Sequence, residues 1–139
     1  MGFGNVSERR SAPPQVGVSV VILALGPKGD TGNSAADSGN AANSAHSRLW
    51  LPLVKRVRQP FLGCWALPGG DLRSDRSLEQ SAYAALESTT DLHPRYLEQL
   101  YTFGGPTRSH GGLPMVSVVY WALVGQTEAA GFEDGDNVR

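Results

Sequence analysis

Cysteine is nearly absent from this 139-residue chain, in which Cys64 is the only one. A single cysteine excludes an internal disulfide and a cysteine cluster for zinc, and it suits a reducing compartment. We therefore expect a cytoplasmic protein. Cys64 has no flanking base or metal motif, so we expect it to be a small buried hydrophobic side chain.

The sequence has no apolar run long enough to cross a bilayer, since the longest spans only residues 16–25. Its N-terminus is polar and proline-rich, whereas a signal peptide is cationic and then apolar. These two features predict that the chain has no membrane partner.

The chain also has no excess of charge of one sign. Twelve Lys and Arg oppose thirteen Asp and Glu, which gives a formal net charge of -1. No general basic field therefore attracts nucleic acid, and a DNA contact would need another domain. The length suffices for one hydrophobic core.

The N-terminal third alternates between polar segments and one apolar strand. Residues 1–14 are polar and end in two prolines, which predicts a flexible arm before a single domain at residues 15–139. Residues 16–25 are β-branched and apolar, as in a strand that is buried on both faces. Residues 26–48 lack large apolar side chains, so we expect a disordered loop insertion.

Three further strands are expected downstream. Residues 49–57 read as one strand in which Pro52 marks an edge or bulged position. Residues 58–70 read as an ordered loop whose Phe61, Trp65 and Leu67 fill the core. The other two strands are at residues 97–103 and 115–124, and a glycine-rich loop joins them.

A helix is expected between these strands. Ser77 and Gln80 have the spacing of a capping box, so the helix begins near Ser77. It ends near Thr89–Asp91. Its apolar face consists of Leu78, Ala82, Ala85 and Leu86.

The segment Trp65–Gly70 with the following helix resembles the Nudix box, the loop–helix–loop signature of the Nudix hydrolases. That pattern is a glycine, five free residues, a glutamate, seven free residues and then Arg-Glu-apolar-x-Glu-Glu-x-Gly-apolar. Three positions match it, namely Gly70, Leu86 and Leu92. Asp91 occupies the glycine position, and the glutamate positions hold Arg76, Ala85, Ser88 and Thr89.

The helical period places positions 85, 88 and 89 on one face, where the family directs its carboxylates at magnesium. Magnesium needs carboxylate oxygens, and alanine and two hydroxyl groups do not supply them. Arg76 would repel the cation. We therefore expect no catalytic residue, no metal site and no cofactor in this chain.

Two other segments resemble one subgroup of this family. YLEQLYTFG at residues 96–104 and the strand at residues 116–124 are similar to the Nudix-related transcriptional regulators of NAD metabolism. This resemblance implies an α/β (α+β) fold of the Nudix type, an αβα sandwich with a mixed central sheet. It also implies an ADP-ribose-like ligand, a homodimer and a winged-helix domain that contacts DNA. Domains of this family usually add a further strand and a second helix, which this sequence lacks. The chain therefore reads as a truncated form, with a partner subunit that covers the sheet as the alternative.

The candidate ligand-binding residues surround the Pro-Gly-Gly turn. Backbone N–H groups of Gly69 and Gly70, together with nearby arginines, could hold a diphosphate without cleaving it. Arg76 could offset phosphate charge in place of the metal. The arginines assigned to this role are Arg56, Arg73 and Arg108.

The aromatic strand residues Tyr101, Phe103 and Trp121 could stack on a base, although we expect them to pack in the core.

Three functional hypotheses follow from the sequence. The first is a non-catalytic sensor of ADP-ribose or a related NAD metabolite. The second is a Nudix hydrolase that uses magnesium with ligands outside the family pattern, such as Asp71, Asp75 or Glu98. The third is a ligand-free interaction scaffold.

Overall fold

The computed structural model describes residues 13–26, 48–105, 107–108, 114–129, 132 and 135–138. Most of the predicted N-terminal arm and loop insertion lies outside these residues. Gly26 and Arg48, which the composition places in the insertion, form the last pair of a strand ladder. These two residues therefore belong to strands β1 and β2 and not to the predicted insertion.

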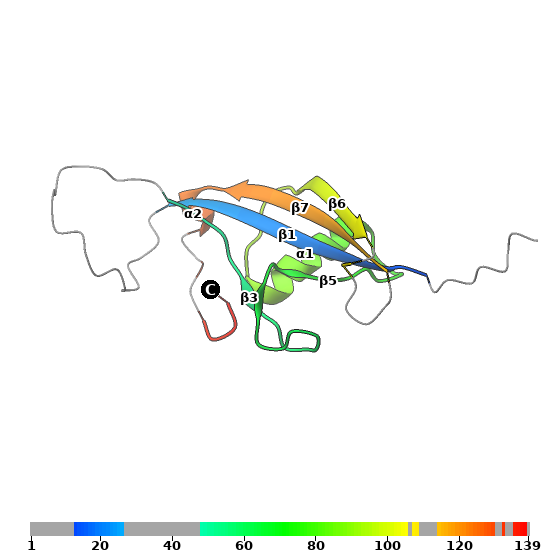
Figure 1. Cartoon of the computed structure of the whole chain (residues 1–139). Helices are drawn as coiled ribbons and strands as arrows, with labels where there is room; N and C mark the ends of the chain where they lie inside the picture. Colours follow the sequence, from blue (N-terminus) through cyan, green and yellow to red (C-terminus); the bar gives the residue numbers. More distant parts are fainter. Residues whose placement is uncertain are drawn as a thin grey trace, which may run out of the picture.

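The described elements form a mixed sheet with two helices (Figure 1). The strand order is β2-β1-β7-β6, and β5 also pairs with β1; only β1 and β7 are parallel. A separate two-stranded ladder joins β3 and β4. The predicted α/β (α+β) class and the mixed sheet are therefore confirmed. The elements are β1 (Gln15–Gly26), β2 (Arg48–Trp50), β3 (Val54–Lys55), β4 (Trp65–Ala66), β5 (Gly69–Asp71), α1 (Leu78–Thr89), β6 (Glu98–Gly105), β7 (Met115–Val124) and α2 (Gln126–Ala129).

One face of the sheet, called the covered face below, is packed against helices. Alternate β1 residues on this face, Val18, Val20 and Ile22, are at most 1% exposed. The even-numbered residues of β7 lie beside them, and Leu86 of α1 and Ala129 of α2 belong to the same core cluster. Figure 1 shows α1 running beneath β1 and β7. The core thus lies between this face and the helices.

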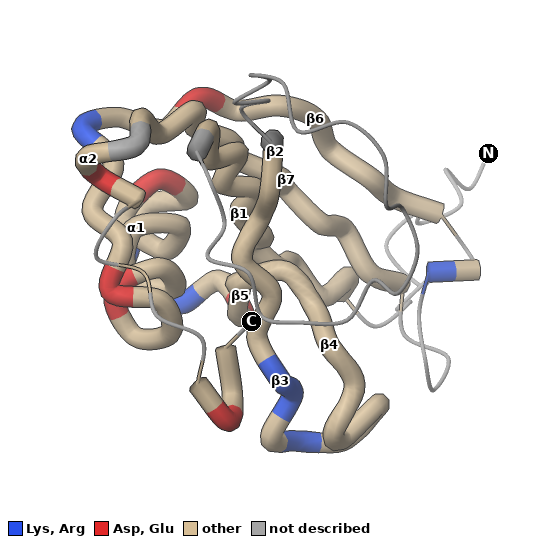
Figure 2. Tube along the Cα trace, turned by 90° about the vertical axis from the view of Figure 1, so that its left-hand side faces the viewer, with Lys and Arg blue, Asp and Glu red and all other residues tan. Residues whose placement is uncertain are grey.

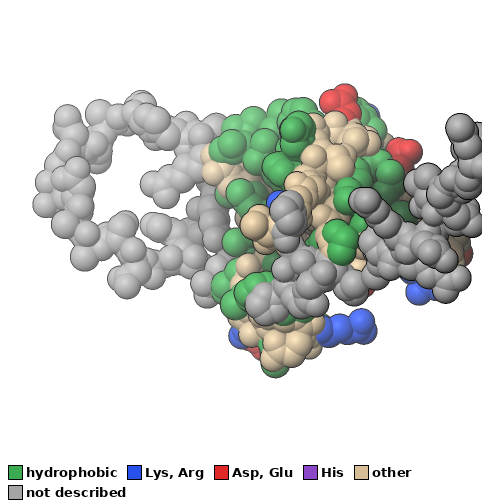
Figure 3. Space-filling view, turned by 45° about the vertical axis from the view of Figure 1, so that its right-hand side comes forward, with side chains coloured by type: hydrophobic (Ala, Val, Ile, Leu, Met, Phe, Trp, Pro, Cys, Tyr) green, Lys and Arg blue, Asp and Glu red, His purple; other side chains and the backbone are tan. Residues whose placement is uncertain are grey.

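The opposite face of the sheet, called the open face, is less protected. The β1 residues that point to it, Ser19, Val21 and Leu23, are half-buried. At the end of β7, Leu123 is exposed, and Tyr101 of β6 is also exposed. The prediction that β1 is buried on both faces is therefore wrong for this side. In the view of Figure 3, hydrophobic side chains occupy much of the described surface, with few charged groups among them.

The predicted strand at residues 49–57 is two strands in different sheets. Pro52 is fully buried between β2 and β3. Because proline has no backbone N–H for a ladder, the strand stops there rather than bulging.

Two side chains near the β3–β4 turn also differ from expectation. Phe61 is exposed instead of filling the core, and Cys64 is exposed instead of buried. Trp65 and Leu67, which we also expected in the core, are half-buried. The hairpin projects away from the main sheet, so its turn cannot reach the core (Figures 1 and 2).

Helix α1 has the predicted ends. The Ser77 hydroxyl accepts from the Gln80 backbone N–H at 3.1 Å, and the Gln80 side chain accepts from the Ser77 N–H at 2.9 Å. Beyond the C-cap residue Thr90, Asp91 has a φ of 54°. The Nudix pattern has glycine at this position, which suits a left-handed conformation. No helix among the described residues is long and apolar enough to cross a membrane.

Replacing Ser77 by alanine removes the capping hydroxyl. We expect the free energy of unfolding to fall by about 1 kcal/mol, because one N–H of the first turn loses its acceptor. Chemical denaturation measures the change. Ser74→Ala, an exposed serine outside the helix, is the control, and an equal loss in both variants would contradict the capping role.

Candidate functional site

The α1 positions that hold metal ligands in the Nudix pattern have other roles here. Ala85 is buried, as predicted. The hydroxyl groups of Ser88 and Thr89 both donate to the Ala85 carbonyl, at 3.1 and 2.6 Å. These side chains are therefore bonded back onto their own helix.

The acids of the hydrolase hypothesis do not converge. Asp71 pairs with Gly17 of β1, and Gly17 pairs in turn with Ser117 of β7. Glu98 pairs with Trp121, which is also in β7. Four residues of extended chain separate those two β7 positions, or about 13 Å. Among the described residues, no group of three His, Cys, Asp or Glu side chains is arranged to hold a metal ion.

The third of these acids, Asp75, is paired with an arginine in the loop before α1. The Arg73 Nε lies 3.0 Å from a carboxylate oxygen of Asp75, and both side chains are exposed. The hydrogen bond from Arg73 lowers the pKa of Asp75, and the nearby charge of Arg76 acts in the same direction. Arg73 therefore already has an anionic partner, and a phosphate would have to compete with Asp75 for it.

The Pro-Gly-Gly turn leads into β5, whose backbone is partly used by the sheet. Two backbone hydrogen bonds lie on either side of Gly70 in the ladder with β1. The Val20 N–H donates to the Pro68 carbonyl at 2.8 Å, and the Leu72 N–H donates to the Val16 carbonyl at 2.9 Å. Hydrogen-bonded pairs alternate along an antiparallel ladder, so Gly70 forms the pair between them. Its N–H therefore points to β1 and not to a ligand.

Gly69 differs from Gly70 in the direction of its N–H and in the space available for a side chain. It is the non-hydrogen-bonded position, so its N–H points away from β1. A Cβ at this position would lie 2.5 Å from the Val18 carbonyl oxygen. Only glycine fits there, and Gly69 is the better donor of the predicted pair.

Arg56 lies in the β3–β4 hairpin. Its Nε donates to the Pro60 carbonyl at 2.8 Å, and its backbone N–H donates to the Cys64 carbonyl. Figure 2 shows Lys and Arg residues on this hairpin, apart from the acidic residues along α1. Arg56 is therefore bonded within its own hairpin.

Arg108 lies on the open face of the sheet. Its Nη2 donates to the Ser117 hydroxyl at 3.2 Å, and its guanidinium lies 5.2 Å from the centre of the Phe103 ring. Ser117 and Asp71 both pair with Gly17 of β1. Two strand spacings, about 10 Å, therefore separate Ser117 from the end of β5. Arg108 and the Gly69 turn lie at the same end of the sheet.

The aromatic residues of β6 lie beside Arg108 and not in the core. Tyr101 and Phe103 are 61% and 40% exposed, and their ring centres are 4.9 Å apart in an edge-to-face contact. The expectation of core packing is therefore wrong for both, whereas Trp121 is half-buried. Ser117, the partner of Arg108, gave no signal in the sequence. Tyr101 and Phe103 are two positions apart and so share one face of β6, but this spacing does not show whether that face is covered.

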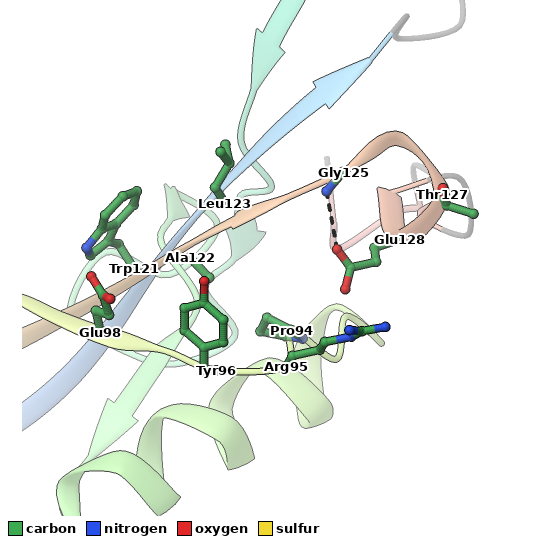
Figure 4. A pocket seen from close by; sticks show the side chains of 10 residues that line it. All are labelled: Pro94, Arg95, Tyr96, Glu98, Trp121, Ala122, Leu123, Gly125, Thr127 and Glu128. Carbon is green, nitrogen blue, oxygen red and sulfur yellow. Dashed lines mark hydrogen bonds between the residues drawn. The ribbon is translucent and has the colours of Figure 1, made fainter.

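The other end of the sheet has a hollow of about 810 Å³ between the start of β6, the end of β7 and α2 (Figure 4). Neither Gly69 nor Arg108 is part of it. Its lining residues are Pro94, Arg95, Tyr96, Glu98, Trp121, Ala122, Leu123, Gly125, Thr127 and Glu128.

Comparison with known proteins gives the fold but no family model matches the chain. An ADP-ribose pyrophosphatase of Methanocaldococcus jannaschii is 32% identical over 68 residues, which are 49% of this chain and 40% of that protein. The chain thus spans less than half the length of this curated relative.

Two solved structures are similar over most of the chain. The Nudix domain of Shewanella oneidensis NrtR in complex with ADP ribose has a TM-score of 0.65 and 28% identity, over 97% of this chain and 77% of that one. A MutT/nudix family protein from Enterococcus faecalis has a TM-score of 0.67 and 26% identity, over 93% of this chain and 44% of that one. The chain therefore has the Nudix fold.

Proposed function

We propose that this Nudix-fold chain binds ADP-ribose or a related NAD metabolite and does not hydrolyse it. The observation that carries the proposal is the α1 face, where Ala85 is buried and the Ser88 and Thr89 hydroxyls donate to its carbonyl. A face without carboxylates offers magnesium no strong ligand. Metal activation of water, on which the hydrolysis by Nudix enzymes depends, would then have no site there.

The groups that would hold the ligand lie at one end of the sheet. Gly69 and the exposed Arg73 are four residues apart in the chain, and Arg108 lies across β1 and β7 from them. An arginine forms two parallel bonds to a phosphate, so Arg108 suits the diphosphate. The exposed Tyr101 and Phe103 beside it offer aromatic surface for a base.

The sensing role extends this binding to regulation. The NrtR domain in complex with ADP ribose supports a nucleotide ligand for this fold. We propose that the chain pairs as a homodimer and reports ligand occupancy to a winged-helix domain outside these 139 residues, which contacts DNA. This part of the proposal rests on the resemblance of residues 96–104 and 116–124 to the regulators of NAD metabolism.

Calorimetric titration with ADP-ribose tests the binding. We expect saturable heat with one ligand per chain, in the presence and in the absence of magnesium, because no metal takes part in binding. AMP and ribose 5-phosphate are the control ligands, and we expect each to bind more weakly than ADP-ribose because it makes only part of the contacts. Absence of heat at millimolar ADP-ribose would contradict the proposal and favour a ligand-free scaffold.

A further inference from the structure

The hollow at the far end of the sheet has an aromatic and apolar lining. Tyr96 and Trp121 both contribute to it, together with the buried residues Pro94 and Ala122. Figure 4 shows the Tyr96 ring standing between Trp121 on one side and Pro94 on the other. Such a surface binds a flat or compact apolar group.

The charges of the hollow are separated along its length. Glu98 lies beside the Trp121 ring, whereas the Arg95 guanidinium extends toward Glu128 at the opposite end (Figure 4). Glu128 accepts a bond from the Gly125 N–H at 3.3 Å, which fixes it at that end. Within the described part of the chain, no Lys or Arg forms an ion pair with Glu98. The aromatic end is therefore locally anionic.

This end lies apart from Arg108, the arginine assigned to the diphosphate. Trp121 is four residues beyond Ser117 on β7, which corresponds to about 13 Å of strand. A ligand in the hollow would therefore leave the Ser117–Arg108 contact intact.

We propose that the hollow binds an organic cation with a compact or flat apolar head. The faces of Tyr96 and Trp121 attract a positive charge through their ring electrons, and Glu98 supplies the counter-charge. The apolar head packs against the exposed Tyr96 ring and the half-buried Trp121 ring. This site goes beyond the proposed nucleotide function and does not depend on it.

The test uses two cations and a neutral molecule of the same shape. Choline and 1-methylpyridinium are titrated into the whole chain, with 3,3-dimethylbutanol as the uncharged counterpart of choline. The readout is the NMR signal of the Trp121 indole N–H, which Trp121→Phe identifies. We expect both cations to shift this signal saturably, and the neutral molecule to bind about tenfold more weakly.

Two isosteric variants separate the carboxylate from general charge. Glu98→Gln should weaken choline binding about fivefold, because the ring contacts remain and the counter-charge is lost. Glu79→Gln removes the same charge from the exposed surface of α1 and should leave binding unchanged. Both side chains are exposed, so both variants should fold.

The result that would overturn the proposal is a Trp121 signal that does not shift, or one that shifts equally with the neutral molecule. Equal cation binding by Glu98→Gln and the wild type would also overturn it. ADP-ribose affinity should be the same in Glu98→Gln and the wild type. A failure of nucleotide binding is thus distinguishable from a failure of the cation site.

Discussion

Replacing Leu86 by alanine should lower the free energy of unfolding by about 3 kcal/mol, because the site cannot collapse around the lost methyl groups. Leu86 is fully buried and joins α1 to the covered face of the sheet, where it belongs to the same cluster as Val20 and Ile22. Denaturation with urea, with an unchanged slope of the transition, measures the loss.

The control for this variant is Glu87→Ala, the next residue on the same helix. Glu87 is exposed, so we expect a change within about 0.5 kcal/mol. Both substitutions leave an alanine in α1, so helix propensity differs little between them. A loss below about 1 kcal/mol for Leu86→Ala would show that α1 does not pack on the sheet as described.

Replacing Arg108 by methionine should weaken ADP-ribose binding by about 30-fold. The variant loses a charge-assisted bond to the diphosphate, which is worth about 2 kcal/mol, while the long apolar stem over Phe103 is kept. Calorimetric titration against the wild type measures the change. Arg108→Lys retains the charge but not the paired geometry, so its loss should be smaller.

Arg58→Met is the matched control for Arg108. Arg58 is an exposed arginine near the β3–β4 turn, outside the proposed ligand contacts, so we expect unchanged affinity. Because Arg108 also donates to Ser117, thermal melts must show that Arg108→Met folds. If folded Arg108→Met binds ADP-ribose as tightly as the wild type, the ligand does not bind on the open face.

The first strand and α1 could be predicted because local patterns determine them. The apolar run from Val16 implies a strand, and the spacing of Ser77 and Gln80 implies the helix start; the structure confirms both. The spacing also predicted the burial of Ala85. Each of these depends on neighbours within a few positions of the chain.

Features that depend on distant packing could not be predicted in the same way. Pro52 was expected at a strand edge, but it is buried between two strands of different sheets. Cys64 was expected inside, and the projecting hairpin exposes it. Composition does not show which segments leave the main sheet.

The candidate site shows the same limit. Of the predicted ligand residues, Gly69 and Arg108 are placed by the register of β5, β1 and β7, which no single segment contains. Arg56 is bonded within its own hairpin and Gly70 faces β1. The exposure of Tyr101 and Phe103 could not be foreseen, because alternation along a strand does not identify the covered face.

Incubation of the protein with ADP-ribose and magnesium, followed by chromatographic measurement of AMP, is the most direct test of binding without hydrolysis. We expect ADP-ribose to bind and to be recovered intact, because Ala85, Ser88 and Thr89 give the metal no carboxylate. Binding without hydrolysis would be contradicted by AMP release that increases with protein concentration and requires magnesium. This release should also be lost in an Asp71→Asn variant.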